Sequence, residues 1–184
     1  MMRPDSTNTA PCAIVAMGVS GSGKSTLAAC LAERLACPFL EGDAFHGEAN
    51  VAKMRAGHPL TDDDRWPWLD RLGAAIGAGA RDGGIVVATC SALKRSYRQR
   101  LESAAGVPLL FVLLDGDAGA LAGRIEHRPG HYMPASLLDS QIATLERPAP
   151  DERAVTLDAG RPQDALCSAA LDWIGGMRAA LPPR

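Results

Sequence analysis

No stretch of the sequence approaches the roughly 18 consecutive apolar residues that a membrane-spanning helix needs. The apolar run from Cys12 to Met17 is also too short for a secretory signal. Acidic and basic residues nearly balance, at 21 and 19, so the chain lacks the basic excess typical of nucleic-acid binding. We therefore expect a cytoplasmic protein that binds neither membranes nor nucleic acid.

Paired cysteine motifs are missing as well. The cysteines are odd in number and none forms a CxxC pair; they are Cys12, Cys30, Cys37, Cys90 and Cys167. The sequence therefore predicts neither a disulfide framework nor a structural zinc site.

The chain of 184 residues is long enough for one domain with a buried core, and 47% of it is hydrophobic. We expect a flexible leader over residues 1–11 and a single domain over 12–180. Short apolar runs occur at 12–17, 39–43, 85–89, 108–115 and 154–158. Helical patterns separate them, at about 27–35, 61–80, 117–127, 135–146 and 162–179. This alternation predicts an α/β fold, a parallel sheet of about five strands flanked by helices.

The segment after the first apolar run fits the phosphate-binding pattern GxxxxGK[ST]. It reads Gly18, Val19, Ser20, Gly21, Ser22, Gly23, Lys24, Ser25 and Thr26. The glycines let backbone N–H groups approach phosphate oxygens, and the helix N-terminus that follows attracts the anion. Lys24 is predicted to reach the β- and γ-phosphates, and the Ser25 hydroxyl to ligate Mg²⁺. A buried strand before the motif and an amphipathic helix after it favour a true P-loop that binds ATP over a chance match.

Other classes of P-loop protein carry additional sequence motifs. The guanine-specificity motif NKxD is absent, since Asn50 is followed by Val51 and no other Asn lies beyond the leader. That argues against a GTP-dependent switch. Asp115 ends an apolar run and could be a Walker B metal ligand, but we favour a plain core strand there.

Four further motifs are distinctive in combination. They are GD-x-x-H at 42–46, HPLTDDDR-x-PWL beginning at residue 58, CSALK at 90–94 and R-x-GH at 128–131. With the P-loop they make the chain, from about Ile14 to Asp158, resemble the gluconokinases, P-loop kinases related to shikimate and adenylate kinases. The resemblance implies transfer of the ATP γ-phosphoryl group to the terminal hydroxyl of D-gluconate, giving 6-phosphogluconate for carbohydrate acid catabolism. It also implies a possible homodimer.

The first motif supplies candidates on the acceptor side. Asp43 is expected to orient or deprotonate the attacking hydroxyl, the alternative being an N-cap before Ala44. His46 either binds substrate or packs. The family commonly has Asp where this chain has Glu41, so a role for Glu41 near the metal stays open.

The next two motifs supply contacts to the sugar acid. The resemblance implies that Arg65 grips the substrate carboxylate as a bidentate pair, the alternative being a surface ion pair. The residues before it, 61–64, are also natural helix caps. Ser91 and Lys94 are predicted to contact substrate. Cys90 is predicted to be a small buried residue, because phosphoryl transfer needs no covalent nucleophile.

The last motif predicts a lid over about 124–134. There Arg124 is expected to bind nucleotide and Arg128 to neutralise charge on the γ-phosphoryl group, the alternative being solvated arginines. His127 and His131 do not form a metal pair, because a Pro and a Gly lie between them.

Two rival functions stay in view. One is another small-molecule P-loop kinase, with shikimate or a nucleotide as acceptor, which the CSALK and HPLTDDDR segments disfavour. The other is an ATP-binding regulator without catalysis, which the presence of both Asp43 and Arg65 disfavours.

Overall fold

A computed structural model describes residues 10–117, 119, 121, 123 and 136–182 of the chain. Within them, five strands form one sheet in the order β2-β3-β1-β4-β5, and every neighbouring pair is parallel. The strands are β1 (Cys12–Met17), β2 (Phe39–Leu40), β3 (Ile85–Thr89), β4 (Leu109–Asp115) and β5 (Ala154–Asp158). The expected α/β fold with a five-stranded parallel sheet is confirmed.

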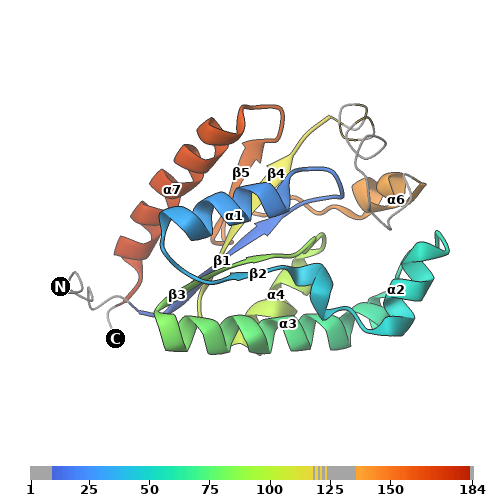
Figure 1. Cartoon of the computed structure of the whole chain (residues 1–184), viewed down its shortest axis with the longest axis horizontal. Coiled ribbons are helices and arrows are strands. Elements are labelled where there is room, and N and C mark those ends of the chain that lie inside the picture. The colour runs from blue at the N-terminus through green and yellow to red at the C-terminus, as the bar shows by residue number, and fades with distance from the viewer. Residues whose placement is uncertain (1–9, 118, 120, 122, 124–135, 183–184) are drawn as a thin grey trace.

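Helices cover both faces of the sheet (Figure 1). They are α1 (Lys24–Arg34), α2 (Glu48–Arg55), α3 (Asp62–Gly83), α4 (Arg95–Ala105), α6 (Ser136–Thr144) and α7 (Gln163–Ala180), with the 3-10 helix η1 (Gly42–Phe45). Helices α1 and α7 lie on one face and α3 and α4 on the other. None of the described helices combines the length and the hydropathy that crossing a membrane requires.

Strand β1 is covered by helices on both faces, which explains its continuous apolar run. Ile14 packs into the cluster under α1 and α7, while its neighbour Val15 packs into the cluster under α3 and α4, and both are fully buried. A strand covered on both faces has no solvent side on which to place polar residues.

Two differences from the sequence prediction concern the segments around the strands. The strand expected at 39–43 ends at Leu40, and Gly42 begins the 3-10 turn instead. A Cβ on Gly42 would lie 1.9 Å from the carbonyl oxygen of Thr89, so the chain is pressed against the end of β3 there. Helices α2 and α4 had no predicted counterpart. Helix α2 buries only Met54, so its apolar periodicity is weak; α4 does bury one face, at Tyr97, Leu101 and Ala105, but most of its residues are polar and the sequence analysis missed it.

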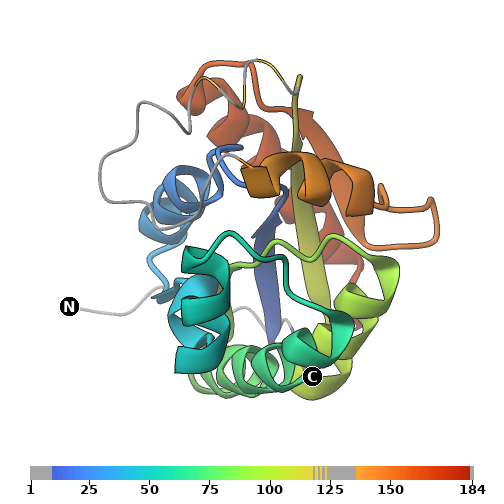
Figure 2. The same ribbon diagram turned by 90° about the vertical axis from the view of Figure 1, so that its right-hand side faces the viewer.

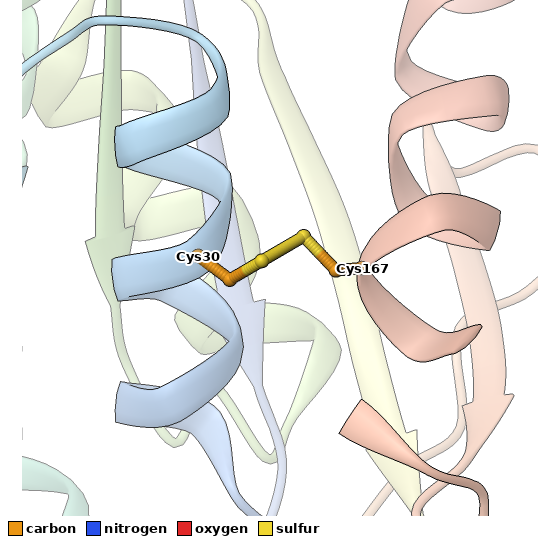
Figure 3. Close-up of a disulfide and its surroundings, with 2 residues drawn as sticks. All are labelled: Cys30 and Cys167. Atoms are coloured by element: carbon orange, nitrogen blue, oxygen red, sulfur yellow. A yellow bond between two sulfur atoms is a disulfide. The ribbon is translucent and has the colours of Figure 1, made fainter. Parts of the chain in front are cut away.

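The cysteine prediction is wrong for one pair. Cys30 of α1 and Cys167 of α7 form a disulfide with Cα atoms 6.5 Å apart (Figure 3). Their sequence separation of 137 leaves no local spacing to find, and only the packing of the two helices on the same sheet face brings them together. The other three cysteines, Cys12, Cys37 and Cys90, are free thiols.

Because all strands are parallel, their carboxyl ends meet at one edge of the sheet. Figure 2 looks onto this edge: α6 lies on one side of the strand ends, and α2 with the start of α3 on the other. In open parallel sheets, ligands bind at this edge.

Candidate active site

The phosphate-binding loop lies between β1 and α1, where the sequence predicted it. Its glycines Gly18, Gly21 and Gly23 have φ of 138°, 77° and 95°, a backbone that side chains with a Cβ rarely adopt. A Cβ on Gly18 would also lie 2.7 Å from the carbonyl oxygen of Leu114. Gly23 is the N-cap of α1 and has no side chain to cap it, so the N–H groups of the first turn suit an anion. Lys24 Nζ donates to the carbonyl of Val19, across the loop, at 3.0 Å.

A cleft opens beside this loop. It brings together six of the predicted site residues: Ser20, Lys24, Asp43, His46, Arg65 and Ser91. The other lining residues are Met54, Pro59, Leu60, Trp68, Leu93, Leu137, Ser140, Gln141 and Thr144. Arg124, Arg128 and the predicted lid at 124–134 lie outside the described residues.

Asp43 stands in η1, and its neighbours fix that turn. The Thr89 hydroxyl donates to the Glu41 carboxylate and accepts from Gly42 N–H at 2.9 Å. The Trp68 indole N–H donates to the Gly42 carbonyl at 2.8 Å. Glu41, not Asp43, occupies the N-cap position of the turn. The cap alternative for Asp43 is therefore not what the structure shows, and Glu41 has a structural partner in the end of β3.

His46 both packs and lines the cleft. Its ring stacks on Trp68 with centroids 4.1 Å apart and an interplanar angle of 18°. Burial lowers the pKa of His46 to about 4; the Asp43 carboxylate opposes this shift, while Arg65 and Arg71 add to it. The imidazole is therefore neutral near pH 7. Its Nδ1 is buried and has no hydrogen-bond partner among the described residues.

Two of the residues before Arg65 act as helix caps, as the alternative reading predicted. Asp64 N–H donates to the Thr61 hydroxyl at 3.2 Å, and Thr61 N–H donates back to the Asp64 carboxylate at 2.7 Å. This reciprocal pair is a capping box at the start of α3. It fixes where the helix begins and therefore where Arg65, one residue later, stands.

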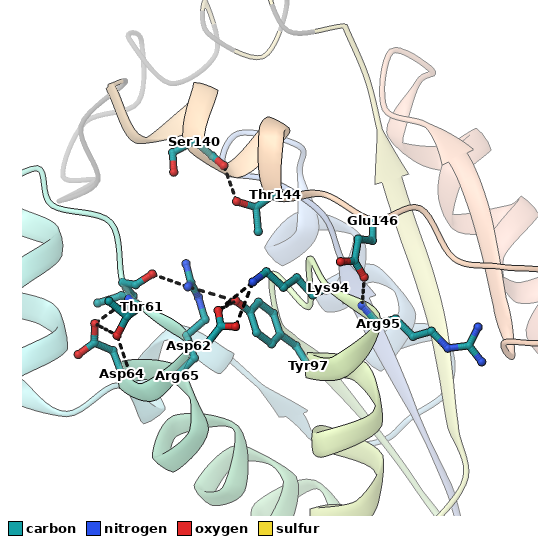
Figure 4. Close-up of polar contacts among 11 residues, drawn as sticks. Thr61, Asp62, Asp64, Arg65, Lys94, Arg95, Tyr97, Ser140, Thr144 and Glu146 are labelled. Carbon is teal, nitrogen blue, oxygen red and sulfur yellow. Dashed lines mark hydrogen bonds and ion pairs between the residues drawn. The ribbon is translucent and has the colours of Figure 1, made fainter.

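Arg65 is held at the cleft by contacts through one nitrogen. Its Nη1 donates to the Leu60 carbonyl and, at 3.3 Å, to the Tyr97 hydroxyl; within the described residues both hydrogen bonds use this atom (Figure 4). Tyr97 in turn donates to the Asp62 carboxylate, which also accepts from Lys94 Nζ at 3.0 Å. Hydrogen bonds from Tyr97 and Lys94 lower the pKa of Asp62. Lys94 does not line the cleft, and its predicted contact with substrate stays a prediction.

The sequence analysis missed the wall of the cleft that α6 supplies. Ser140, Gln141 and Thr144 line it, and the Ser20 N–H donates to the Gln141 side-chain oxygen at 2.7 Å. Figure 4 shows Thr144 on the side of α6 that faces Arg65 and Lys94. Polar residues spaced three and four apart on a helix were the available signal, as Gln141 and Ser140 are from Thr144, because such residues share one face.

Two alternatives near the site are decided by burial and pairing. Cys90 is 1% exposed and burial raises its pKa to about 12, so its thiol is inert, and the prediction of a small buried residue is confirmed. The Asp115 carboxylate forms an ion pair with Arg147 at 2.6 Å, which favours the core-strand reading. No group of three or more potential metal-ligating side chains occurs in the described part of the chain.

Comparisons with known proteins agree with this site. A family profile described as an AAA domain matches residues 14–148. The gluconokinase of Gluconobacter oxydans (strain 621H) is 49% identical over 153 residues, 83% of this chain and 85% of the relative. The crystal structure of a gluconokinase from Sinorhizobium meliloti 1021 is 48% identical with a TM-score of 0.80, covering 92% of this chain and 95% of that one. An unliganded sugar kinase from Janibacter sp. HTCC2649 is 46% identical with a TM-score of 0.83, over 92% and 98%.

The fold and the cleft together define a P-loop kinase, an enzyme that transfers a phosphoryl group. At these identities over most of its length, the chain belongs to the gluconokinase family.

Proposed function

We propose that this protein phosphorylates D-gluconate with ATP, giving 6-phospho-D-gluconate and ADP for the catabolism of carbohydrate acids. One observation carries the proposal. A P-loop lysine (Lys24), a carboxylate (Asp43) and a guanidinium (Arg65), from three separate elements, line one cleft. Phosphoryl transfer to an anionic hydroxy acid needs these three groups: one for phosphate, one for the attacking hydroxyl and one for the acid. Use of ATP favours the cytoplasm as the working compartment.

The donor half of the reaction belongs to the P-loop. Its N–H groups and the Lys24 ammonium hold the β- and γ-phosphates and stabilise charge on the transferring group. The glycine cradle fits this task, because Gly18 leaves no room for a Cβ. Bound Mg²⁺ neutralises charge on the phosphate oxygens, and we propose the half-buried Ser25 hydroxyl at the start of α1 as its protein ligand. The roles expected of Arg124, in binding nucleotide, and of Arg128, in neutralising charge on the γ-phosphoryl group, are part of this proposal.

The acceptor half belongs to η1, α3 and the segment after β3. Asp43 orients the terminal hydroxyl and accepts its proton, while the Arg65 guanidinium binds the carboxylate at the other end of the acceptor. The neutral His46 ring contacts the polyol chain, and Ser91 offers it a hydrogen bond. Lys94 reaches the acceptor only if its ammonium turns from Asp62 towards it.

A coupled assay of ADP release tests the proposal. The panel contains gluconate, other aldonic acids, shikimate and nucleoside monophosphates, with the Lys24→Ala variant as the catalytic blank. We expect the highest kcat/KM with gluconate and none above background in the variant. Highest turnover with shikimate or a nucleotide would assign a related kinase, and ATP binding without turnover of any acceptor would support the regulator.

A further inference from the structure

A hydrogen bond links the phosphate-binding loop to α6 across the cleft. The Ser20 N–H donates to the Gln141 side-chain oxygen at 2.7 Å, although the two residues are 121 apart in sequence. Both line the cleft with Lys24 and Asp43. N–H groups of such loops are donors for phosphate oxygens. The carboxamide oxygen of Gln141 therefore accepts from an N–H group that a phosphate oxygen could also use.

Helix α6 is held to the acceptor side of the cleft by apolar contacts. Leu137 forms a buried cluster with Met54 of α2 and Leu60. Leu138 packs into the core cluster that includes α3. The helix thus rests on segments of the acceptor side, and Gln141 reaches from it to the donor loop. Gln141 stands at the junction of the two halves of the site.

The contact with Ser20 is one that a nucleotide triphosphate can break. Hydrogen bonds to a charged phosphate oxygen are roughly twice as strong as those between neutral groups, so a phosphate displaces the neutral carboxamide from the N–H. Ser20 lines the same cleft as Asp43, so the phosphate nearest to its N–H is the one that faces the acceptor. In ATP this is the γ-phosphate, which ADP lacks.

On the basis of the proposed function, we propose that Gln141 is a positioning residue that couples γ-phosphate binding to acceptor binding. Its carboxamide leaves the Ser20 N–H when ATP binds and then hydrogen-bonds the terminal hydroxyl of the acceptor. Because a carboxamide both donates and accepts, it can hold that hydroxyl while Asp43 accepts the proton. ATP, unlike ADP, thereby raises the affinity for the acceptor, and the coupling is reciprocal.

The first experiment uses nucleotides alone. Dissociation constants of Mg²⁺-ADP and of a non-hydrolysable Mg²⁺-ATP analogue are measured by calorimetry for the wild type, Gln141→Ala and Gln141→Glu. The control is Asp139→Asn, an exposed position on the same helix. Without a competing acceptor on Ser20, Gln141→Ala should bind the analogue about fivefold tighter, the equivalent of one hydrogen bond, with ADP unchanged. Gln141→Glu should bind the analogue about tenfold more weakly, because its carboxylate meets the γ-phosphate. An unchanged ratio of the two constants in both variants overturns the proposal.

The second experiment measures gluconate binding in the presence of each nucleotide. In the wild type, the dissociation constant for gluconate should be about fivefold or more lower with the analogue than with ADP, within the usual range of such coupling. In Gln141→Ala the two gluconate constants should coincide, while Asp139→Asn keeps the wild-type difference. Tightening that persists in Gln141→Ala overturns the coupling. If the wild type binds no gluconate, the proposed function fails. The ratio of the dissociation constants for ADP and the ATP analogue still decides whether Gln141 competes with the γ-phosphate.

Discussion

Asp43 illustrates how a functional side chain is placed by the backbone beside it. Its preceding residue, Gly42, is held by Thr89 through its N–H and by Trp68 through its carbonyl. Asp43 itself therefore needs no side-chain hydrogen bond to stay in position at the cleft. No described residue forms a hydrogen bond or ion pair with the Asp43 carboxylate, so we expect that it can be changed with little effect on folding.

The Asp43→Asn variant is the sharpest test of catalysis. It keeps the size and one acceptor oxygen but removes the charge and the basicity. We expect kcat to fall by about two orders of magnitude or more, the range of positioned acid–base groups. Nucleotide affinity should barely change, because the P-loop is untouched. Turnover near the wild-type rate in this variant would redirect the search for the carboxylate to Asp62, Asp63 and Asp64.

The Arg65→Lys variant tests recognition of the acid. Lysine keeps the positive charge but loses the planar fork and the Nη1 contacts with Leu60 and Tyr97. KM for gluconate should rise about tenfold or more while KM for ATP stays nearly constant, since one good ionic contact contributes roughly 1.5–3 kcal/mol. Arg100→Lys, at an exposed ion pair on α4, is the matched control and should leave both KM values unchanged. Equal changes in the two KM values of Arg65→Lys argue for a general structural role.

His46 gives a prediction for pH. Burial lowers its pKa to about 4, from the ordinary 6.5 that applies in the unfolded chain. The unfolded state therefore binds more protons between these values, and the free energy of unfolding should decrease as the pH falls from 6.5 towards 4. Proton NMR should show the His46 ring titrating near 4, assigned with His46→Gln. The His46→Gln variant should also lose stability less steeply than the wild type over this window. A ring that titrates near 6.5 contradicts the burial argument.

Site residues could be predicted where they lie together in one contiguous sequence motif. The P-loop is such a pattern, and its position after β1 is the predicted one. The family resemblance pointed to Arg65, which does line the cleft. Gln141 was not predictable, because its partner Ser20 lies 121 residues away and the contact depends on how α6 rests on α2. Trp68 and Tyr97 were missed for a related reason, since an aromatic residue on a helix reads as core until its polar partner is known.

At the scale of elements, the strands buried on both faces were the easiest to predict. β1, β3 and β5 have the expected bounds, and β4 differs by one residue. β2 was predicted too long because hydropathy does not show where a chain leaves the sheet. Its end depends on the close approach of Gly42 to Thr89, a tertiary contact.

The Gly42→Ala variant tests this element. An added Cβ would lie 1.9 Å from the Thr89 carbonyl oxygen, which is backbone and cannot turn away. We expect a loss of about 1–3 kcal/mol in the free energy of unfolding, as in other overpacked sites, and a fall in kcat because η1 carries Asp43. Gly175→Ala is the control: it is inside α7 with no atom within 4 Å of the added Cβ, so it should stabilise slightly. A Gly42→Ala protein with wild-type stability and kcat would show that the turn is not fixed by this contact.

At the scale of the whole molecule, the two sheet faces have different tasks. The α3 and α4 face carries the acceptor residues, through Arg65 and the Asp62–Tyr97 contact. The α1 and α7 face carries the disulfide between Cys30 and Cys167. The sequence pattern predicted helices flanking the sheet but not this covalent link between two helices of the same face, since period and hydropathy say nothing about which two helices touch.

The disulfide leads to a prediction for the whole fold. It closes a loop with a sequence separation of 137, and such long loops lose much unfolded-state entropy on closure. Reduction, or the double variant Cys30→Ala/Cys167→Ala, should therefore lower the free energy of unfolding by about 2–4 kcal/mol, measured by urea denaturation. Activity should change little, because the bond lies on the sheet face away from the acceptor residues.

Reductant should not shift the urea midpoint of the double variant, which controls for effects on the other thiols. Titration of the denatured, unreduced protein with a thiol reagent should find Cys12, Cys37 and Cys90 alone. Because a reducing compartment would open this bond, the oxidised and reduced forms are to be compared side by side. Reaction of all five cysteines in the unreduced protein, or equal midpoints with and without reductant, would contradict a disulfide that joins the two helices.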